Sequence, residues 1–194
     1  MSFFKQKGIV DPRLVREYVR SPTRDLLDEV ADFVASNTVG PVESFMSVMA
    51  SLNKLGRFHH TIRLWERLIS TTNDRRKSPT EVAYNIAMHA YFQTGKPDNA
   101  WDLYLELKRK AQQQEAEGKQ NSKREEVSLT PGEWTYGTLI SGLTKSNRFD
   151  KALLVVDEMK KQGIELNVAM SNMLISGFTK AGRYDEALQV ARDL

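Results

Sequence analysis

The sequence has no cysteine, few prolines and no long apolar run. Without thiols, the 194-residue chain can form neither disulfides nor thiolate metal sites. The longest strongly aliphatic run, residues 153–156, is far too short to cross a bilayer, so membrane insertion is not expected. A hydrophobic content of 40% with only 6 prolines and 11 glycines suits a soluble helical protein.

The charge balance excludes little. A net charge of +3 and a pI of about 9.0 permit binding to a polyanion but do not demand it. The first ten residues carry two lysines and no acid. They are too short and too weakly apolar for a secretory signal, and a remnant of a mitochondrial or plastid transit sequence is an alternative. The chain stops at Leu194 within a helical pattern, so we expect it to be part of a longer protein.

The usual constellations of catalytic residues are also missing. No glycine-rich loop has the spacing that cradles a phosphate, and no pair of histidines has zinc-helix spacing. Carboxylates such as Asp157 and Glu186 stand among lysines, as on solvated helix faces. The sequence therefore predicts no enzyme, no metal site, no cofactor and no small-molecule substrate.

What is present is a repeated turn between two amphipathic segments. The turns are centred on Gly56, Gly95, Asn147 and Gly182, at spacings of 39, 52 and 35 residues. Glycine, then asparagine, is the cheapest residue at the left-handed position after a helix. A helix–turn–helix motif that recurs with a period near 35 residues predicts an all-α solenoid of stacked hairpins.

Apolar residues at helical spacing support this fold, because stacked hairpins share one core. The two clearest hairpins are expected to bury the following side chains: Tyr136, Leu139, Ile140, Leu143, Phe149, Ala152, Leu153, Val156 and Met159 in one, and Leu174, Ile175, Phe178, Tyr184, Ala187, Leu188, Ala191 and Leu194 in the other. The small Ala152 and Ala187 are expected where two helix backbones approach closely.

The pattern divides the chain into a degenerate hairpin and four repeats. The hairpin covers residues 1–41, and repeats 1 to 4 cover 42–80, 81–132, 133–167 and 168–194, the last of them truncated. Repeat 2 is lengthened by a polar insert at about 109–126. Its second helix is expected to continue to about Glu117 before a loop begins.

Two segments carry a family resemblance. TYGTLISGLTKSNRFDKAL (135–153) and SNMLISGFTKAGRYDEAL (171–188) each resemble a pentatricopeptide repeat, and repeat 2 is a good match interrupted by the insert. The resemblance implies a right-handed superhelix whose first helices line a groove for single-stranded RNA, with about one base per repeat. It also implies a location in mitochondria or plastids.

The resemblance further implies roles for individual residues. The fifth and the last residue of a repeat together read a base, which gives the pairs Met46 with Thr80, Asn85 with Gly132, and Gly137 with Asn167, and then Asn172 alone. The amides of Asn85 and Asn172 could read a base edge, with a preference for pyrimidines. No pair is a complete familiar reading pair.

The second residue of each repeat is expected to stack on a base, and a lysine near the end of the first helix to meet phosphate. The stacking positions hold Val82, Trp134 and Ala169, whereas Glu43 in repeat 1 would repel phosphate. The phosphate positions hold Lys54, Lys145 and Lys180. Packing of Trp134 against the next repeat and scattered surface lysines are the structural alternatives.

Three functions are compatible with these observations. The leading one is a single-stranded RNA-binding adaptor in organellar RNA metabolism or translation, acting by stoichiometric binding. The second is a scaffold that binds protein and rRNA within a large organellar assembly such as the mitochondrial ribosome, with protein subunits as partners. The third is a tetratricopeptide-type module that binds protein.

Overall fold

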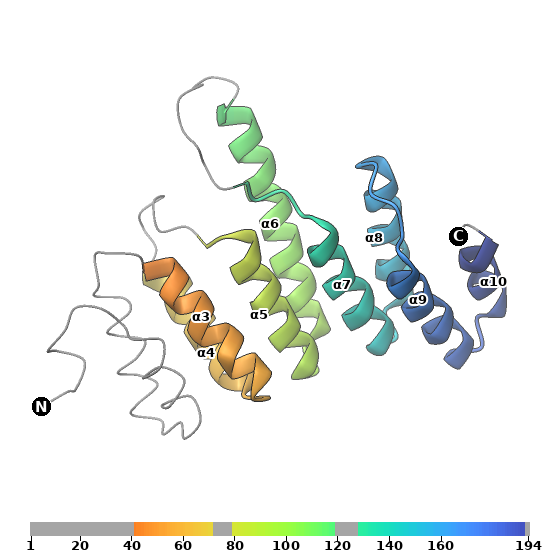
Figure 1. Cartoon of the computed structure of the whole chain (residues 1–194), viewed down its shortest axis with the longest axis horizontal. Helices are drawn as coiled ribbons and strands as arrows, with labels where there is room; N and C mark the ends of the chain where they lie inside the picture. The colour runs from red at the N-terminus through yellow and green to blue at the C-terminus, as the bar shows by residue number, and fades with distance from the viewer. Residues whose placement is uncertain (1–40, 72–78, 119–127, 193–194) are drawn as a thin grey trace, which may run out of the picture. The chain divides into compact units, whose positions relative to one another are not determined.

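The computed structural model describes residues 41–71, 79–118 and 128–192, and every regular element in these ranges is a helix. The helices are α3 (Pro41–Lys54), α4 (Phe58–Thr71), α5 (Glu81–Gln93), α6 (Pro97–Gly118), α7 (Glu133–Lys145), α8 (Phe149–Lys161), α9 (Val168–Lys180) and α10 (Tyr184–Arg192) (Figure 1). The all-α prediction is confirmed for these ranges. The degenerate hairpin expected at 1–41 lies outside them, apart from Pro41.

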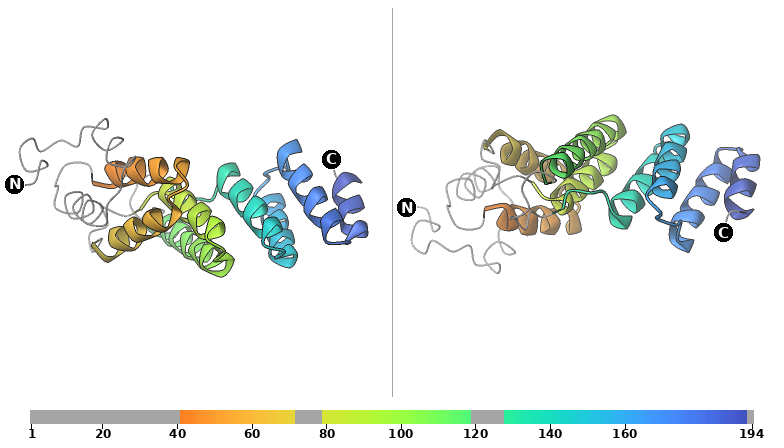
Figure 2. Two further views of the ribbon diagram at one scale, coloured as in Figure 1. Left: turned by 90° about the horizontal axis from the view of Figure 1, so that it is seen from below. Right: turned by 90° about the horizontal axis from the view of Figure 1, so that it is seen from above.

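Two compact units make up the chain. Unit 1 covers residues 1–90 and so contains α3, α4 and most of α5; unit 2 covers residues 91–194 and contains α6 to α10. Within unit 2, α7 packs against both α8 and α9, and α9 packs against α10 (Figure 2). First helices of successive repeats are therefore neighbours in this unit.

The turn inside each hairpin has the predicted left-handed residue. The φ angles are 69° at Gly56, 72° at Gly95, 56° at Asn147 and 73° at Gly182. One residue later, a backbone N–H donates to the carbonyl five positions back, as from Arg148 to Leu143 at 2.8 Å. This is a Schellman closure, which satisfies the last carbonyls of the first helix and reverses the chain within a few residues.

The core of unit 1 is held by aromatic packing and by one polar brace. The rings of Trp65 and Tyr84 meet edge to face with centroids 4.8 Å apart. Asn53 of α3 donates through Nδ2 to the carbonyl of Ile86 at 2.9 Å and accepts from the Thr61 hydroxyl at 2.8 Å. Because Thr61 is fully buried, this bond satisfies a hydroxyl that has no access to water. One side chain thus links α3, α4 and α5.

The core of unit 2 follows the predicted faces of α7 and α8 closely. The side chains buried as predicted are Tyr136, Leu139, Ile140, Leu143, Phe149, Ala152, Val156 and Met159. Leu153, by contrast, is only half-buried, and Val155 takes a fully buried place that the pattern did not predict. The buried face of α8 therefore differs from the predicted face at this point. The neighbouring helices, and not the apolar spacing alone, decide which side chains are covered.

The prediction was partly wrong in repeat 4. Leu174, Phe178 and Ala187 are buried as expected, but Ile175 is half-buried and Ala191 is exposed. Tyr184 and Leu188 are also largely exposed, at 62% and 55%. In the described part of the chain α10 packs on α9, so only the side of α10 that faces α9 is covered. Val190 is buried there instead, and Leu194 lies outside the described residues.

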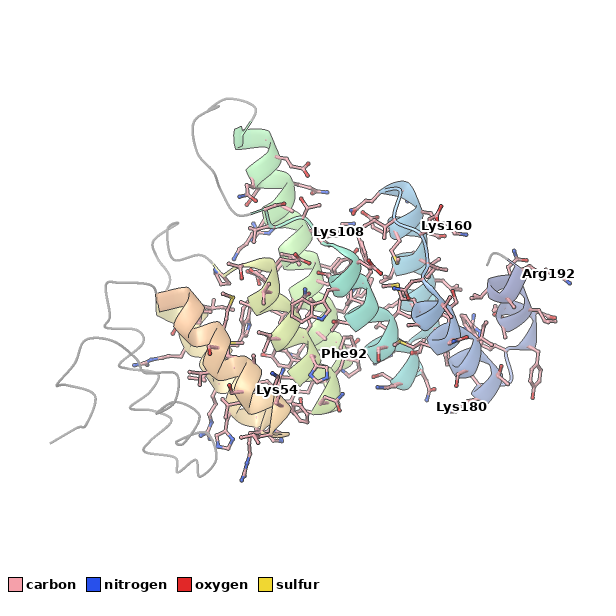
Figure 3. The ribbon with its side chains drawn as sticks, viewed as in Figure 1. Lys54, Phe92, Lys108, Lys160, Lys180 and Arg192 are labelled. Atoms are coloured by element: carbon pink, nitrogen blue, oxygen red, sulfur yellow. The ribbon has the colours of Figure 1, made fainter. Side chains whose placement is uncertain are left out.

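Two glycines at equivalent positions allow close approach in unit 2. A methyl group added at Gly142 of α7 would overlap the ring of Phe92, which Figure 3 labels. At Gly177 of α9, the added carbon would lie 3.1 Å from Cβ of Thr144 and 3.2 Å from Cε1 of Phe149. The ring of Phe92 thus leaves no room for even an alanine side chain at Gly142.

The insert begins as a helical extension. α6 ends at Gly118, close to the expected end at Glu117, and residues 119–127 lie outside the described part. Ala111 is buried in the extension, and the Gln114 side chain accepts a hydrogen bond from the Leu129 backbone at 3.1 Å. Among the described helices none is both long and apolar enough to cross a membrane.

We expect Gly142→Ala to lower the free energy of unfolding by about 1–3 kcal/mol, although alanine is the better helix former, because the methyl group overpacks against Phe92. Chemical denaturation of the full chain would measure the change. Ser141→Ala on the same helix is the control. A Gly142→Ala variant as stable as the parent would contradict the close packing.

Candidate nucleic-acid interface

The three lysines predicted to meet phosphate occupy the same structural position. Lys54, Lys145 and Lys180 are the last residues of α3, α7 and α9, and all three are exposed (Figure 3 labels Lys54 and Lys180). A cation there complements the negative end of the helix dipole. No acid in the described part of the chain pairs with Lys145 or Lys180. Because α7 and α9 are neighbours, these two lysines stand at corresponding ends of adjacent helices.

The predicted stacking residues lie at the opposite ends of the first helices. Val82, Trp134 and Ala169 are the second residues of α5, α7 and α9, and each is exposed. Trp134 exposes 55% of its surface, which leaves an aromatic face accessible to solvent. The exposed part of the ring is available for the predicted stacking role, which stays a prediction.

The fifth positions differ among the four repeats. Asn172 is exposed, whereas Asn85 is buried, with 1% of its surface accessible. Gly137 is half-buried, and Cε of Met170 lies 3.3 Å from the point where a Cβ would be. Met46 is half-buried as well. Two asparagines on first helices, Asn85 and Asn172, were predicted to read bases. In the described residues, only Asn172 of these two is exposed to solvent.

The last residue of each of repeats 1 to 3 immediately precedes the next first helix, where a helix cap lies. The Thr80 hydroxyl donates to the sulfur of Met46 at 2.9 Å, so the structure brings this predicted pair together. Asn167 is the N-cap of α9: its Oδ1 accepts from the backbone N–H of Met170 at 2.9 Å. Gly132 takes the N-cap position of α7 and offers no side chain.

The second helices of unit 2 are joined by ion pairs that recur from one repeat to the next. Arg148 contacts Asp98 at 2.8 Å, and 35 residues later Arg183 contacts Asp150 at 3.2 Å. Lys151 also bonds to Asp98, and this bond is the main cause that lowers the pKa of the Asp98 carboxyl below its usual range. These three cations are paired with acids, unlike Lys145 and Lys180, so they are less available to a polyanion.

Arg57, His60 and Arg63 form a basic cluster around the start of α4, and this cluster was not predicted from the sequence. His60 is half-buried, and burial lowers the pKa of its imidazole, as do the charges of Arg63 and Arg57. The signal was present as a run of basic residues at helical spacing. The described residues hold no group of three histidine or carboxylate side chains that could bind a metal ion.

Three family models match the chain. The model described as PPR repeat matches residues 82–111, the PPR repeat family matches 131–169, and the pentatricopeptide repeat domain matches 154–194. The chain carries pentatricopeptide repeats. No curated protein matches it significantly.

Solved pentatricopeptide repeat structures have the same fold. The crystal structure of the protein PPR10 from maize has a TM-score of 0.62 and 23% identity, and covers 96% of this chain but 24% of that one. PPR10 in complex with an 18-nt psaJ RNA element gives 0.56 and 21%, over 88% of this chain and 22% of that one. Nuclear proteinaceous RNase P 2 from A. thaliana gives 0.60 and 18%, over 94% and 38%. The chain therefore spans well under half the length of these proteins.

We expect Arg63→Ala to raise the pKa of His60 toward its ordinary value of 6.5, because one of the charges that disfavour the imidazolium is removed. In the parent protein the folded state binds fewer protons than the unfolded state. The free energy of unfolding therefore falls as the pH drops below 6.5. An NMR titration of the His60 ring measures the midpoint. Arg63→Lys keeps the charge and serves as control; equal midpoints in all three proteins would refute this cause.

Proposed function

We propose that this pentatricopeptide repeat chain is a single-stranded RNA-binding adaptor that acts by stoichiometric binding. The observation that carries the proposal is the arrangement of α7 and α9. Each of these neighbouring helices ends in an exposed lysine, Lys145 or Lys180, and exposes its second residue, Trp134 or Ala169, at the other end. One side of the hairpins thus repeats a cation for the backbone and a surface for a base.

The dimensions of the helix suit this division. Eight residues separate Asn172 from Lys180 on α9, which corresponds to about 12 Å along the axis. A strand whose phosphates lie near the lysines would direct its bases toward the first half of each helix. Bound in this way, the protein would shield the RNA from nucleases, remodel a hairpin or recruit other factors. None of these actions requires a catalytic residue.

Support for RNA as the ligand comes from the pentatricopeptide repeats of this chain and from the solved complex of PPR10 with an RNA element. We extend the proposal to RNA metabolism or translation in mitochondria or plastids, as the family resemblance implies. One solved structure of the same fold is that of a nuclear proteinaceous RNase P, so the fold alone does not determine the compartment.

The decisive test is selection of bound RNAs from a random single-stranded pool at near-physiological salt. A motif of a few bases with a pyrimidine preference is expected for a sequence-reading adaptor. Tight binding without selection would support a backbone-gripping protein instead. Absence of binding would refute the proposal and direct attention to a protein partner.

A second candidate is a scaffold in a large organellar ribonucleoprotein assembly. It is favoured by the finding that Asn85 is buried and that Asn167 caps a helix, since both asparagines were expected to read bases. Co-purification with a discrete complex that survives ribonuclease treatment would favour this candidate. A free monomer under those conditions would argue against it.

We expect replacement of Lys54, Lys145 and Lys180 by alanine to flatten the salt dependence of RNA affinity. Single-strand slopes of about −0.7 per neutralised phosphate predict a loss of about two units. Affinity measured over a salt series gives the slope. Lys108→Ala is the control, because the ammonium of Lys108, which Figure 3 labels, is paired with Glu158 at 2.9 Å. An unchanged slope in the triple variant would exclude these lysines as phosphate contacts.

A further inference from the structure

Two asparagines that were predicted to read bases each donate a side-chain hydrogen bond to a glutamate in the first turn of a helix. Asn85 donates through Nδ2 to Oε1 of Glu81 at 3.3 Å within α5. Asn167 donates through Nδ2 to Oε1 of Glu133, at the start of α7, at 2.5 Å. A carboxylate only accepts hydrogen bonds, so the NH₂ group of each asparagine must face it. Both glutamates are the first residue of their repeat.

These bonds leave the two asparagines little with which to read a base. In Asn167 the other end of the amide is also occupied, because Oδ1 accepts from the Met170 backbone. Asn85 keeps an Oδ1 that makes no hydrogen bond, but this atom is buried and the side chain is 1% exposed. Neither amide is offered to a ligand in the groove.

Asn172 lacks this restraint. The residue four positions earlier is Val168, where repeat 2 has Glu81 before Asn85. Val168 is 69% exposed, and its side chain cannot accept a hydrogen bond. In the part of the chain that the structure describes, no group bonds the amide of Asn172, which is itself exposed. Its donor and its acceptor are both accessible.

We propose that Glu81 and Glu133 are positioning residues that withdraw Asn85 and Asn167 from base reading, so that base choice in the described repeats rests on Asn172. This inference depends on the proposed RNA binding. Repeat 3 then contributes affinity through Trp134 and Lys145, and repeat 2 through stacking at Val82, without selecting a base. The identity of the first residue of a repeat determines whether its asparagine is available.

The test is a base-by-base affinity profile of the full chain, with each position of a bound oligonucleotide changed to all four bases. The unmodified protein should show a preference at one position only. Asn172→Ala should reduce that preference by about three- to tenfold, the loss expected for one net hydrogen bond. Uniform charge effects cancel, because the readout is the ratio of affinities for two bases at one position.

Two reciprocal pairs of variants test the glutamates themselves. Val168→Glu should copy the relation of Glu81 to Asn85 and lower the preference at the Asn172 position by about twofold, the size of one such pair on a helix. Val168→Leu changes the size without adding an acceptor and should leave the ratio unchanged. Glu133→Val should create a second preferred position, whereas Glu133→Gln retains an acceptor oxygen and should not.

A second readout does not involve RNA. In NMR spectra of the free protein, the side-chain NH₂ signals of Asn167 should shift in Glu133→Val, and those of Asn172 should shift in Val168→Glu. Unmoved signals in both variants would overturn the hydrogen-bonding part of the inference. Base preferences at several positions of the unmodified protein, or identical profiles for Glu133→Val and Glu133→Gln, would overturn its functional part. Failure of the unmodified protein to bind RNA would overturn the proposed function together with the inference, whatever the NMR result.

Discussion

The left-handed residue between the two helices of each hairpin is the constraint on which the other features depend. At Gly56, Gly95, Asn147 and Gly182 the chain reverses within a few residues and closes the end of the first helix with backbone hydrogen bonds. The reversal lets α3 pack on α4, α7 on α8 and α9 on α10. In unit 2, it also leaves α7 and α9 free to contact each other. Without it, the repeat could not place equivalent residues on equivalent surfaces.

Helix polarity then orders the charges on the first helices. The positive end of a helix favours an acidic side chain, and the negative end favours a basic side chain. α7 follows this rule with Glu133 at its start and Lys145 at its end. The same electrostatics that stabilise the helix thus create a repeated cation where a phosphate backbone could lie. They also place a carboxylate beside the positions expected to read bases.

Much of the fold follows from local sequence. Glycine and asparagine fixed the turns, and apolar spacing predicted the buried sides of α7 and of α9 in large part. The exposure of Lys145 and Lys180 was likewise expected from the resemblance. Burial of Val155 in place of Leu153 was not, because it depends on the neighbours that surround α8. Nor could spacing reveal that Phe92 fills the space beside Gly142.

The candidate site was less predictable than the fold, for a reason that lies in the asparagine side chain. An amide both donates and accepts, so any nearby carboxylate or backbone N–H competes with a base for it. Asn85 and Asn172 occupy the same position in their repeats, yet one is buried and bonds a glutamate while the other is open. In the proposed RNA binding, a reading position is therefore defined by its residue type together with the hydrogen-bonding groups around it. In this chain, the difference between glutamate and valine at the first residue of a repeat carries as much information as the asparagine itself.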